Sequence, residues 1–313
     1  MAVPDKMTPT QAPRPPRQNQ QMSTTLRTNR RAVLAALCLA CTGVALAHQQ
    51  GATIVRYPQW SDKEEFGATL IKVALAKSGG NYIVEPVRKG MQQGRIIAEI
   101  ASASGVADVM ATMTSIEREQ RLLPIRIPID KGLLGWRIAL VKADQKALMA
   151  SVRNLADLAR LRAGQGHDWP DVDILRANGL SVRGVVELEG LFHMLALGRI
   201  DYCPRAIVEL KRDADAHPEL AVDSHLLLHY PTAMYFFVNK RNTHLADDIE
   251  RGLAAAIADG SFEQIFTHFF GESMRQARLD GRRIIELHNP TLPPATPLER
   301  KELWFKPDTR SLP

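Results

Sequence analysis

From residue 52 onward, short apolar runs alternate with stretches whose apolar residues recur at helical spacing. The runs predict β-strands, and the stretches between them predict amphipathic helices. Strands are expected at 52–57, 82–87, 108–111, 137–141, 225–230 and 233–239. Helices are expected after residue 61, around 96–101, at 154–161, from 168 to 179, at 245–259 and at 262–270. Three further segments, 181–187, 191–197 and 200–202, continue the alternation of strands and helices. This order is typical of an α/β fold.

Turn-forming residues add detail to this pattern. Gly164-Gln165-Gly166 predicts a glycine-flanked turn. Asp168 is expected to cap the following helix, and Pro170 suits the first turn of that helix. From Asn289 on the chain is rich in proline, so we expect it to wrap the surface or to fray.

The N-terminal stretch 22–47 has the order of a secretory signal peptide. Three arginines precede an apolar segment at 32–40, and Ala45-Leu46-Ala47 supplies an A-x-A cleavage sequence. The apolar segment is shorter than the roughly 20 residues that a membrane span needs. We therefore expect residues 1–47 to be an N-terminal extension and signal peptide, cleaved after Ala47, and the product to be periplasmic. Sec and twin-arginine export both remain open, as do three start codons, Met1, Met7 and Met22.

The charge and the cysteine content limit which partners and which kinds of site the chain can have. The whole chain has 40 basic and 34 acidic residues, but the first 47 residues contain six of the basic and one of the acidic residues, which leaves a net charge of +1. This balance gives no electrostatic footprint for nucleic acid. Cys38 and Cys41 leave with the signal peptide, so Cys203 remains alone. An internal disulfide and a cysteine-based zinc cluster are thereby excluded from the exported chain.

Catalytic and metal motifs are missing from the sequence. His225 and His229 have a spacing that suits a metal on a helix, but their segment is predicted as a strand, which would hold the rings about 13 Å apart. The sequence contains no G-x-S-x-G, no H-E-x-x-H and no phosphate loop. We expect no cofactor and no metal.

Four segments, taken in order, resemble one known family. They are Asp108-Val109-Met110-Ala111-Thr112-Met113-Thr114 followed by Arg118, Gly198-Arg199-Ile200-Asp201-Tyr202, Tyr235-Phe236-Phe237-Val238 and Asp259-Gly260-Ser261-Phe262. Their order and spacing, from residue 53 to about 270, resemble those of the type II periplasmic solute-binding proteins of the polar-amino-acid class.

The resemblance implies a two-lobed α/β fold in which each lobe is a sheet flanked by helices. Lobe 1 would comprise 52–136 and 239–313, lobe 2 would comprise 142–233, and hinge strands would lie near 137–141 and 234–238. A small polar ligand would bind in the cleft between the lobes, which close by hinge motion. The family also implies a monomer that serves an inner-membrane ABC permease or a sensor.

On the same resemblance, Arg118 matches the arginine that holds a ligand carboxylate. A guanidinium offers a planar fork of donors that fits two carboxylate oxygens. Thr112 and Thr114 would add hydroxyl groups beside it. A second interpretation is a surface ion pair within Glu117-Arg118-Glu119.

In lobe 2 the sequence departs from the amino-acid binders of the family. The acid that holds a ligand ammonium group is replaced by Ala206, with Arg205 before it. Either Arg205 faces the cleft and favours an anionic ligand, or it pairs with Glu209 on a helix. Gln165 and His167 are further candidates for hydrogen bonds to the ligand.

Trp60, which follows the first predicted strand, either stacks on the ligand or packs as a structural aromatic. The function expected from all this is capture of an amino acid or organic acid for uptake, without catalysis. Two alternatives are a sensory ligand-binding protein and a cyclohexadienyl-dehydratase-like enzyme. The enzyme would need a general acid, for which His167 and Asp168 are the candidates.

Overall fold

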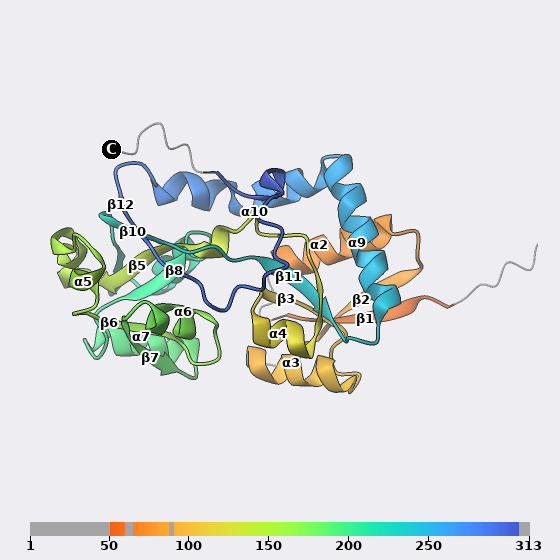
Figure 1. The fold of residues 1–313 in the computed structure, drawn as a ribbon, viewed down its shortest axis with the longest axis horizontal. Coiled ribbons are helices and arrows are strands. Elements are labelled where there is room, and N and C mark those ends of the chain that lie inside the picture. The colour runs from red at the N-terminus through yellow and green to blue at the C-terminus, as the bar shows by residue number, and fades with distance from the viewer. Residues whose placement is uncertain (1–50, 60–64, 88–90, 307–313) are drawn as a thin grey trace, which may run out of the picture. The chain divides into compact units, whose positions relative to one another are not determined.

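The computed structural model describes residues 51–59, 65–87 and 91–306. The predicted signal peptide, its cleavage site and Trp60 lie outside these residues. The strands fall into two groups, which Figure 1 shows at opposite sides of the described chain. None of the helices in the described ranges is both long enough and apolar enough to span a membrane.

The first group of strands forms two small sheets. A parallel pair consists of β1 (Thr53–Pro58) and β2 (Tyr82–Val87), and a three-stranded antiparallel sheet consists of β3 (Val109–Met113), β11 (Met234–Val238) and β4 (Leu123–Ile125). The helices of this group are α2 (Phe66–Lys77), α3 (Gln93–Ser102), α4 (Ile116–Arg121), α9 (Thr243–Ala258) and α10 (Ser261–Ala277). We call these strands and helices lobe 1.

The second group also forms two sheets. The larger has the order β12 (Arg283–Glu286), β10 (Leu226–His229), β5 (Trp136–Lys142) and β8 (Cys203–Ala206), with β9 (Leu220–Val222) beside β5. The smaller is a parallel pair of β6 (Arg162–Gly166) and β7 (Ser181–Val185). The helices are α5 (Leu155–Leu158), α6 (Asp171–Ala177), α7 (Leu188–Ala196) and α8 (Leu210–Ala216). We call these elements lobe 2.

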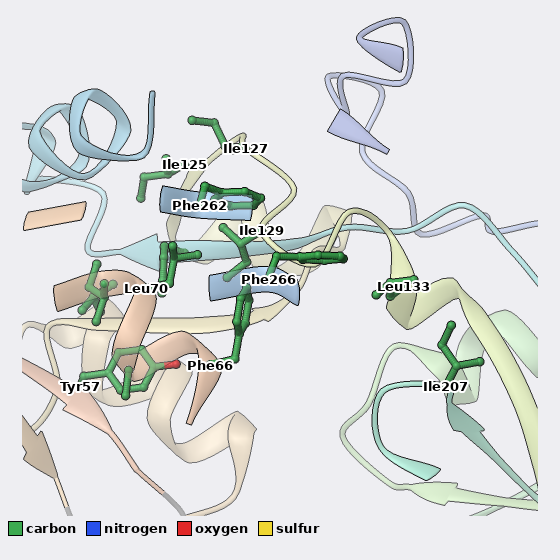
Figure 2. Packing of buried hydrophobic residues seen from close by; sticks show 14 of the residues in the cluster. Tyr57, Phe66, Leu70, Ile125, Ile127, Ile129, Leu133, Ile207, Phe262 and Phe266 are labelled. Carbon is green, nitrogen blue, oxygen red and sulfur yellow. The ribbon is translucent and has the colours of Figure 1, made fainter. Parts of the chain in front are cut away.

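Aromatic side chains of two helices build much of the core of lobe 1. Phe66 of α2 lies with its ring centroid 6.5 Å from that of Phe266 and 4.5 Å from that of Phe270, both on α10. Figure 2 shows Phe66 and Phe266 among the buried residues of this cluster. Burying an aromatic side chain of this size contributes about 1.5–3 kcal/mol to stability. The α2–α10 contact therefore explains why the apolar positions of both segments recur at helical spacing.

One carboxylate holds together two of the chain segments that connect the lobes. Asp130 accepts hydrogen bonds from the backbone N–H groups of Gly132 (3.1 Å) and Leu134 (2.9 Å) in the first segment. It also accepts one from Met234 (3.0 Å), where the second segment enters β11. The expected hinge strands 137–141 and 234–238 themselves lie inside β5 and β11, so the connecting residues directly precede both strands.

The C-terminal part of the chain contributes to both lobes. Residues 283–286, which the sequence assigned to lobe 1, form β12 and pair in parallel with β10 of lobe 2. The proline-rich tail then returns to lobe 1, where Thr291 accepts a hydrogen bond from Ile116 N. At its end Phe305 N donates to Lys131 O, beside the first connecting segment. The tail thus wraps the surface, as one of the two expectations for it stated.

The predicted turn at 164–166 is wrong, because these residues form the end of β6 and pair with β7. The two glycines do not form a turn but allow neighbouring side chains to pack against the strand. A side chain at Gly164 would collide with Ile200 and Leu191, and one at Gly166 would collide with the ring of Trp169. Both glycines let neighbouring side chains lie directly on the strand.

Candidate functional site

The side chain of Arg118 lies where lobe 1 meets lobe 2. Ser115 caps α4 by accepting a hydrogen bond from Arg118 N at 3.1 Å, which orients the start of this helix. The Arg118 guanidinium donates from Nη1 to Thr112 Oγ1 (2.6 Å) and to Met113 O (2.9 Å). Its Nη2 donates to Gln93 Oε1 and to the backbone carbonyl of Asp168, both at 3.0 Å. The last contact crosses from lobe 1 to lobe 2.

Arg118 is a buried cation whose hydrogen-bond acceptors in the described part of the chain are all neutral. Its side chain is 2% exposed, and burial lowers its pKa to about 10, although the charges of Asp168 and Asp171 oppose that shift. Within the described ranges, no carboxylate oxygen forms an ion pair with it. A buried charge is costly unless it is paired. The guanidinium is therefore suited to a partner that brings a negative charge.

Asp168 of lobe 2 reaches into lobe 1 with both its side chain and its backbone. Its carboxylate accepts a hydrogen bond at 2.8 Å from Gly94 N, in the first turn of α3. The prediction that Asp168 caps the following helix is wrong, because α6 begins after Pro170 and shows no side-chain cap. Beside this contact, Gln92 Nε2 donates to Glu187 Oε1 at 3.3 Å. The start of α3 is thus a second place where the lobes touch.

The two threonines expected at the site have different surroundings. Thr112 accepts a hydrogen bond from Arg118 and donates one to Gln93 Oε1 at 3.1 Å. Thr114 is fully buried and donates to Glu119 Oε1 at 2.8 Å. The structure therefore places Thr112 beside Arg118, where it supports the guanidinium, and directs Thr114 toward α4.

The two candidates Gln165 and His167 in lobe 2 also have different surroundings. Gln165 is fully buried on β6 and donates from Nε2 to Pro204 O at 3.0 Å, inside lobe 2. His167 is exposed and follows β6 directly, with its backbone N–H bonded to Val185 O at 3.0 Å. His167 thus lies in the short segment that carries Asp168 to lobe 1, whereas the Gln165 side chain serves the interior of lobe 2.

Arg205 lies in the interior of lobe 2 and not at the junction. It is 1% exposed, and its guanidinium carbon lies 5.1 Å from the ring centre of Trp169. Ion pairs join it to Glu209 (3.1 Å) and Asp213 (2.6 Å). Burial lowers the pKa of Arg205, but the two carboxylates outweigh this effect and raise the pKa above its usual value. The pair with Glu209 agrees with the alternative interpretation of Arg205.

Solved structures with the same arrangement of elements identify the fold. No known protein family matches the sequence, and no curated protein does. An ancestral arginine-binding protein bound to glutamine is similar at 19% identity, with a TM-score of 0.56, over 71% of this chain and 99% of that chain. The probable amino-acid ABC transporter extracellular-binding protein YtmK from Bacillus subtilis is similar at 16% identity, with a TM-score of 0.54, over 71% of this chain and 99% of that one. The ancestral amino acid-binding protein AncCDT-1, a precursor of cyclohexadienyl dehydratase, is similar at 16% identity, with a TM-score of 0.53, over 69% and 95%.

The chain has the type II periplasmic binding protein fold. This confirms the two-lobed α/β architecture that the sequence segments predicted. Within this binding-protein fold, the position expected to carry an acid is Ala206, which is fully buried on β8 and paired with Arg137 of β5. Lobe 2 brings the carboxylate of Asp168 to the junction.

The sequence did not predict that Gln93 and Asp168 contact Arg118. Gln93 belongs to the polar pair Gln92-Gln93 that precedes the apolar face of α3, and this pair was the available indication. Asp168 was read as a helix cap because it stands two residues before a proline. In the part of the chain that the structure describes, no group of three or more histidine, cysteine or acidic side chains is placed to hold a metal ion.

Proposed function

We propose that this chain is an exported solute-binding protein that captures a small, carboxylate-bearing molecule between its two lobes by hinge closure. The ligand is an amino acid or an organic acid. Arg118 binds the ligand carboxylate, Thr112 and Gln93 orient the guanidinium, and the 166–169 segment closes from lobe 2. The bound solute is then passed to an inner-membrane ABC permease, and the protein acts in the periplasm as a monomer.

The observation that carries this proposal is the buried guanidinium of Arg118, which has no carboxylate partner among the residues that the structure describes. Its four hydrogen bonds within the described ranges go to one hydroxyl, one side-chain amide and two backbone carbonyls. A ligand carboxylate at the same place would supply the missing negative charge and a bidentate pair. Charge-assisted bonds of this kind contribute roughly 1.5–3 kcal/mol each.

The similar structures support the same class of ligand. One is bound to glutamine, a second is bound to arginine, and a third, a ligand-binding core from Nostoc punctiforme, is in complex with L-glutamate. All three ligands carry the α-carboxylate that suits Arg118. Because Ala206 stands where an acid would hold an ammonium group, organic acids that lack such a group are included in the proposal.

A thermal-shift screen of the exported chain tests the proposal. The panel contains the twenty amino acids, succinate, malate and citrate, with sugars and polyamines as uncharged and cationic controls. We expect stabilisation by at least one carboxylate and by none of the controls. Stabilisation by a sugar or a polyamine alone would contradict the proposal. Mass spectrometry of compounds that copurify with the protein gives a second, panel-independent answer.

The catalytic alternative is favoured by one comparison, the similarity to a precursor of cyclohexadienyl dehydratase. In the structure the carboxylate of Asp168, one of the two candidates for a general acid, accepts a hydrogen bond from Gly94 N. Turnover of prephenate by the purified chain, lost in Asp168→Asn and His167→Gln, would establish the enzyme.

A further inference from the structure

We propose that Asp168 is a built-in competitor for the ligand carboxylate and a latch between the lobes. In the structure it occupies the donors at the lobe junction, and a carboxylate ligand binds only by displacing it. This inference rests on the proposed function, because it assumes that Arg118 is the ligand anchor.

The geometry of Asp168 joins two donors that are far apart in the sequence. Its carboxylate accepts from Gly94 N at 2.8 Å, and its backbone carbonyl accepts from Arg118 Nη2 at 3.0 Å. Gly94 lies 74 positions away and Arg118 lies 50 positions away. A single residue of lobe 2 therefore occupies both the first turn of α3 and the side of the guanidinium that faces lobe 2.

Both of these donors favour negative charge. The first backbone N–H groups of a helix lack partners within the helix and lie at the positive end of its dipole. Arg118 is buried and has no carboxylate partner in the described ranges. The Asp168 carboxylate is the charge that now approaches them, and it favours the charged form of Arg118. An anionic ligand would meet the same donors and would be repelled by Asp168 while that residue remains in place.

The backbone around Asp168 keeps it in this position. His167 N is bonded to Val185 O, and Trp169 N is bonded to Gly166 O at 3.1 Å. The Trp169 ring lies on Gly166, so closely that a side chain there would collide with it. The segment is therefore anchored within lobe 2, and Asp168 loses its lobe 1 partners when the lobes separate.

The latch has a consequence for affinity. A closed, ligand-free state must open before a ligand enters, so the apparent affinity is reduced by the fraction of molecules that are open. Opening breaks the two Asp168 contacts and the neighbouring bond from Gln92 to Glu187. Removal of the Asp168 carboxylate is expected to raise the open fraction and to free Gly94 N.

The test compares Asp168→Ala and Asp168→Asn with the matched control Asp173→Ala. Asp173 is an exposed aspartate on α6, five positions further along the same lobe. The first readout needs no ligand: the distance between spin labels at Lys72→Cys on α2 and Arg160→Cys in lobe 2, measured by electron–electron double resonance. Both positions are exposed, and the native Cys203 is buried and does not label. The second readout is the dissociation constant for L-glutamate, L-glutamine and succinate.

We expect the ligand-free wild type and Asp173→Ala to share one short label distance, and Asp168→Ala to shift to a longer one. We also expect Asp168→Ala to bind the carboxylate that stabilises the wild type at least tenfold more tightly, with Asp168→Asn in between. Unchanged distances would overturn the latch, and weaker binding by Asp168→Ala would make Asp168 a ligand contact and overturn the competitor. A longer distance with no carboxylate bound by any variant would instead contradict the proposed function and leave the latch intact.

Discussion

The guanidinium Nη2 of Arg118 lies 3.0 Å from the backbone carbonyl oxygen of Asp168, so a buried cation of lobe 1 is bonded to a neutral acceptor of lobe 2. A carboxylate would be a stronger partner at this place. Under the proposed function, Arg118 serves two purposes: it makes this contact between the lobes, and it anchors an anion when one is bound.

The buried ion pairs of Arg205 are expected to matter for stability. Arg205→Leu removes the partner of Glu209 and of the buried Asp213, and leaving a buried carboxylate underpaired costs about 3 kcal/mol. Asp213 keeps a contact with Arg212 at 3.0 Å. We therefore expect the free energy of unfolding to fall by about 3 kcal/mol and not by more. Urea unfolding of the ligand-free protein measures the change.

Arg212→Leu is the matched control for that substitution, because Arg212 is 69% exposed and contacts the same Asp213. An exposed ion pair contributes about 0–1 kcal/mol, so the control should change stability little. Equal losses in both variants would contradict the placement of Arg205 in the interior of lobe 2.

The stability of the fold should fall in acid partly through Glu209. Burial raises the pKa of Glu209, but the charges of Arg205 and Arg137 outweigh it and hold the pKa below its usual value. A carboxylate with a lowered folded-state pKa contributes stability above the unfolded-state pKa, and this contribution is lost as the pH falls through the folded-state pKa. Glu209→Gln should therefore flatten the decline of unfolding free energy below about pH 4.5.

Denaturant unfolding at several pH values between 7 and 3 measures this slope. Glu250→Gln, on the exposed face of α9, serves as the control and should keep the wild-type slope. A Glu209→Gln variant whose stability declines as steeply as that of the wild type would show that this carboxylate is not held by the arginines.

The destabilisation that Gly132→Ala causes through contact with the C-terminal tail can be distinguished from the part that backbone strain causes. Gly132 and Gly281 have nearly the same left-handed conformation, with φ values of +76° and +75°. A side chain at Gly132 would lie 2.7 Å from the Trp304 ring, whereas Gly281 faces open space. Gly281→Ala should cost about 1 kcal/mol from backbone strain alone, and Gly132→Ala should cost more.

The Trp304→Ala background isolates the collision, because Gly132→Ala should then cost about as much as Gly281→Ala. Unfolding free energies of the two single variants, Trp304→Ala and the double variant complete the cycle. An unchanged cost of Gly132→Ala in the absence of the Trp304 ring would mean that the tail does not lie on the first connecting segment.

Local patterns predicted much of the fold. The strand at 82–87 was predicted with its observed bounds, because its apolar and β-branched residues lie between a glycine pair and a charged run. The long helix before Gly260 was also predicted, since this glycine takes φ of +80° where the helix ends. Both elements depend on neighbours in the sequence, which a single sequence displays.

The contacts between the lobes could not be predicted in the same way. Arg118 was found because it matched a family segment, but its partners Gln93 and Asp168 lie 25 and 50 positions away. The turn predicted at 164–166 is a strand that pairs with β7, and the Ile200 side chain fills the space beside Gly164. In each case the partner lies far away in the sequence, and no local pattern encodes it.

The most direct test of the account is isothermal titration of the best-stabilising carboxylate against Arg118→Gln, with Arg121→Gln as the control. Arg121 lies on the same helix and is partly exposed in a pair with Glu117 at 3.0 Å. Loss of the charge-assisted bonds of Arg118 should weaken binding about tenfold or more, while the control binds as the wild type does. An unchanged dissociation constant in Arg118→Gln would contradict the claim that this arginine anchors the ligand.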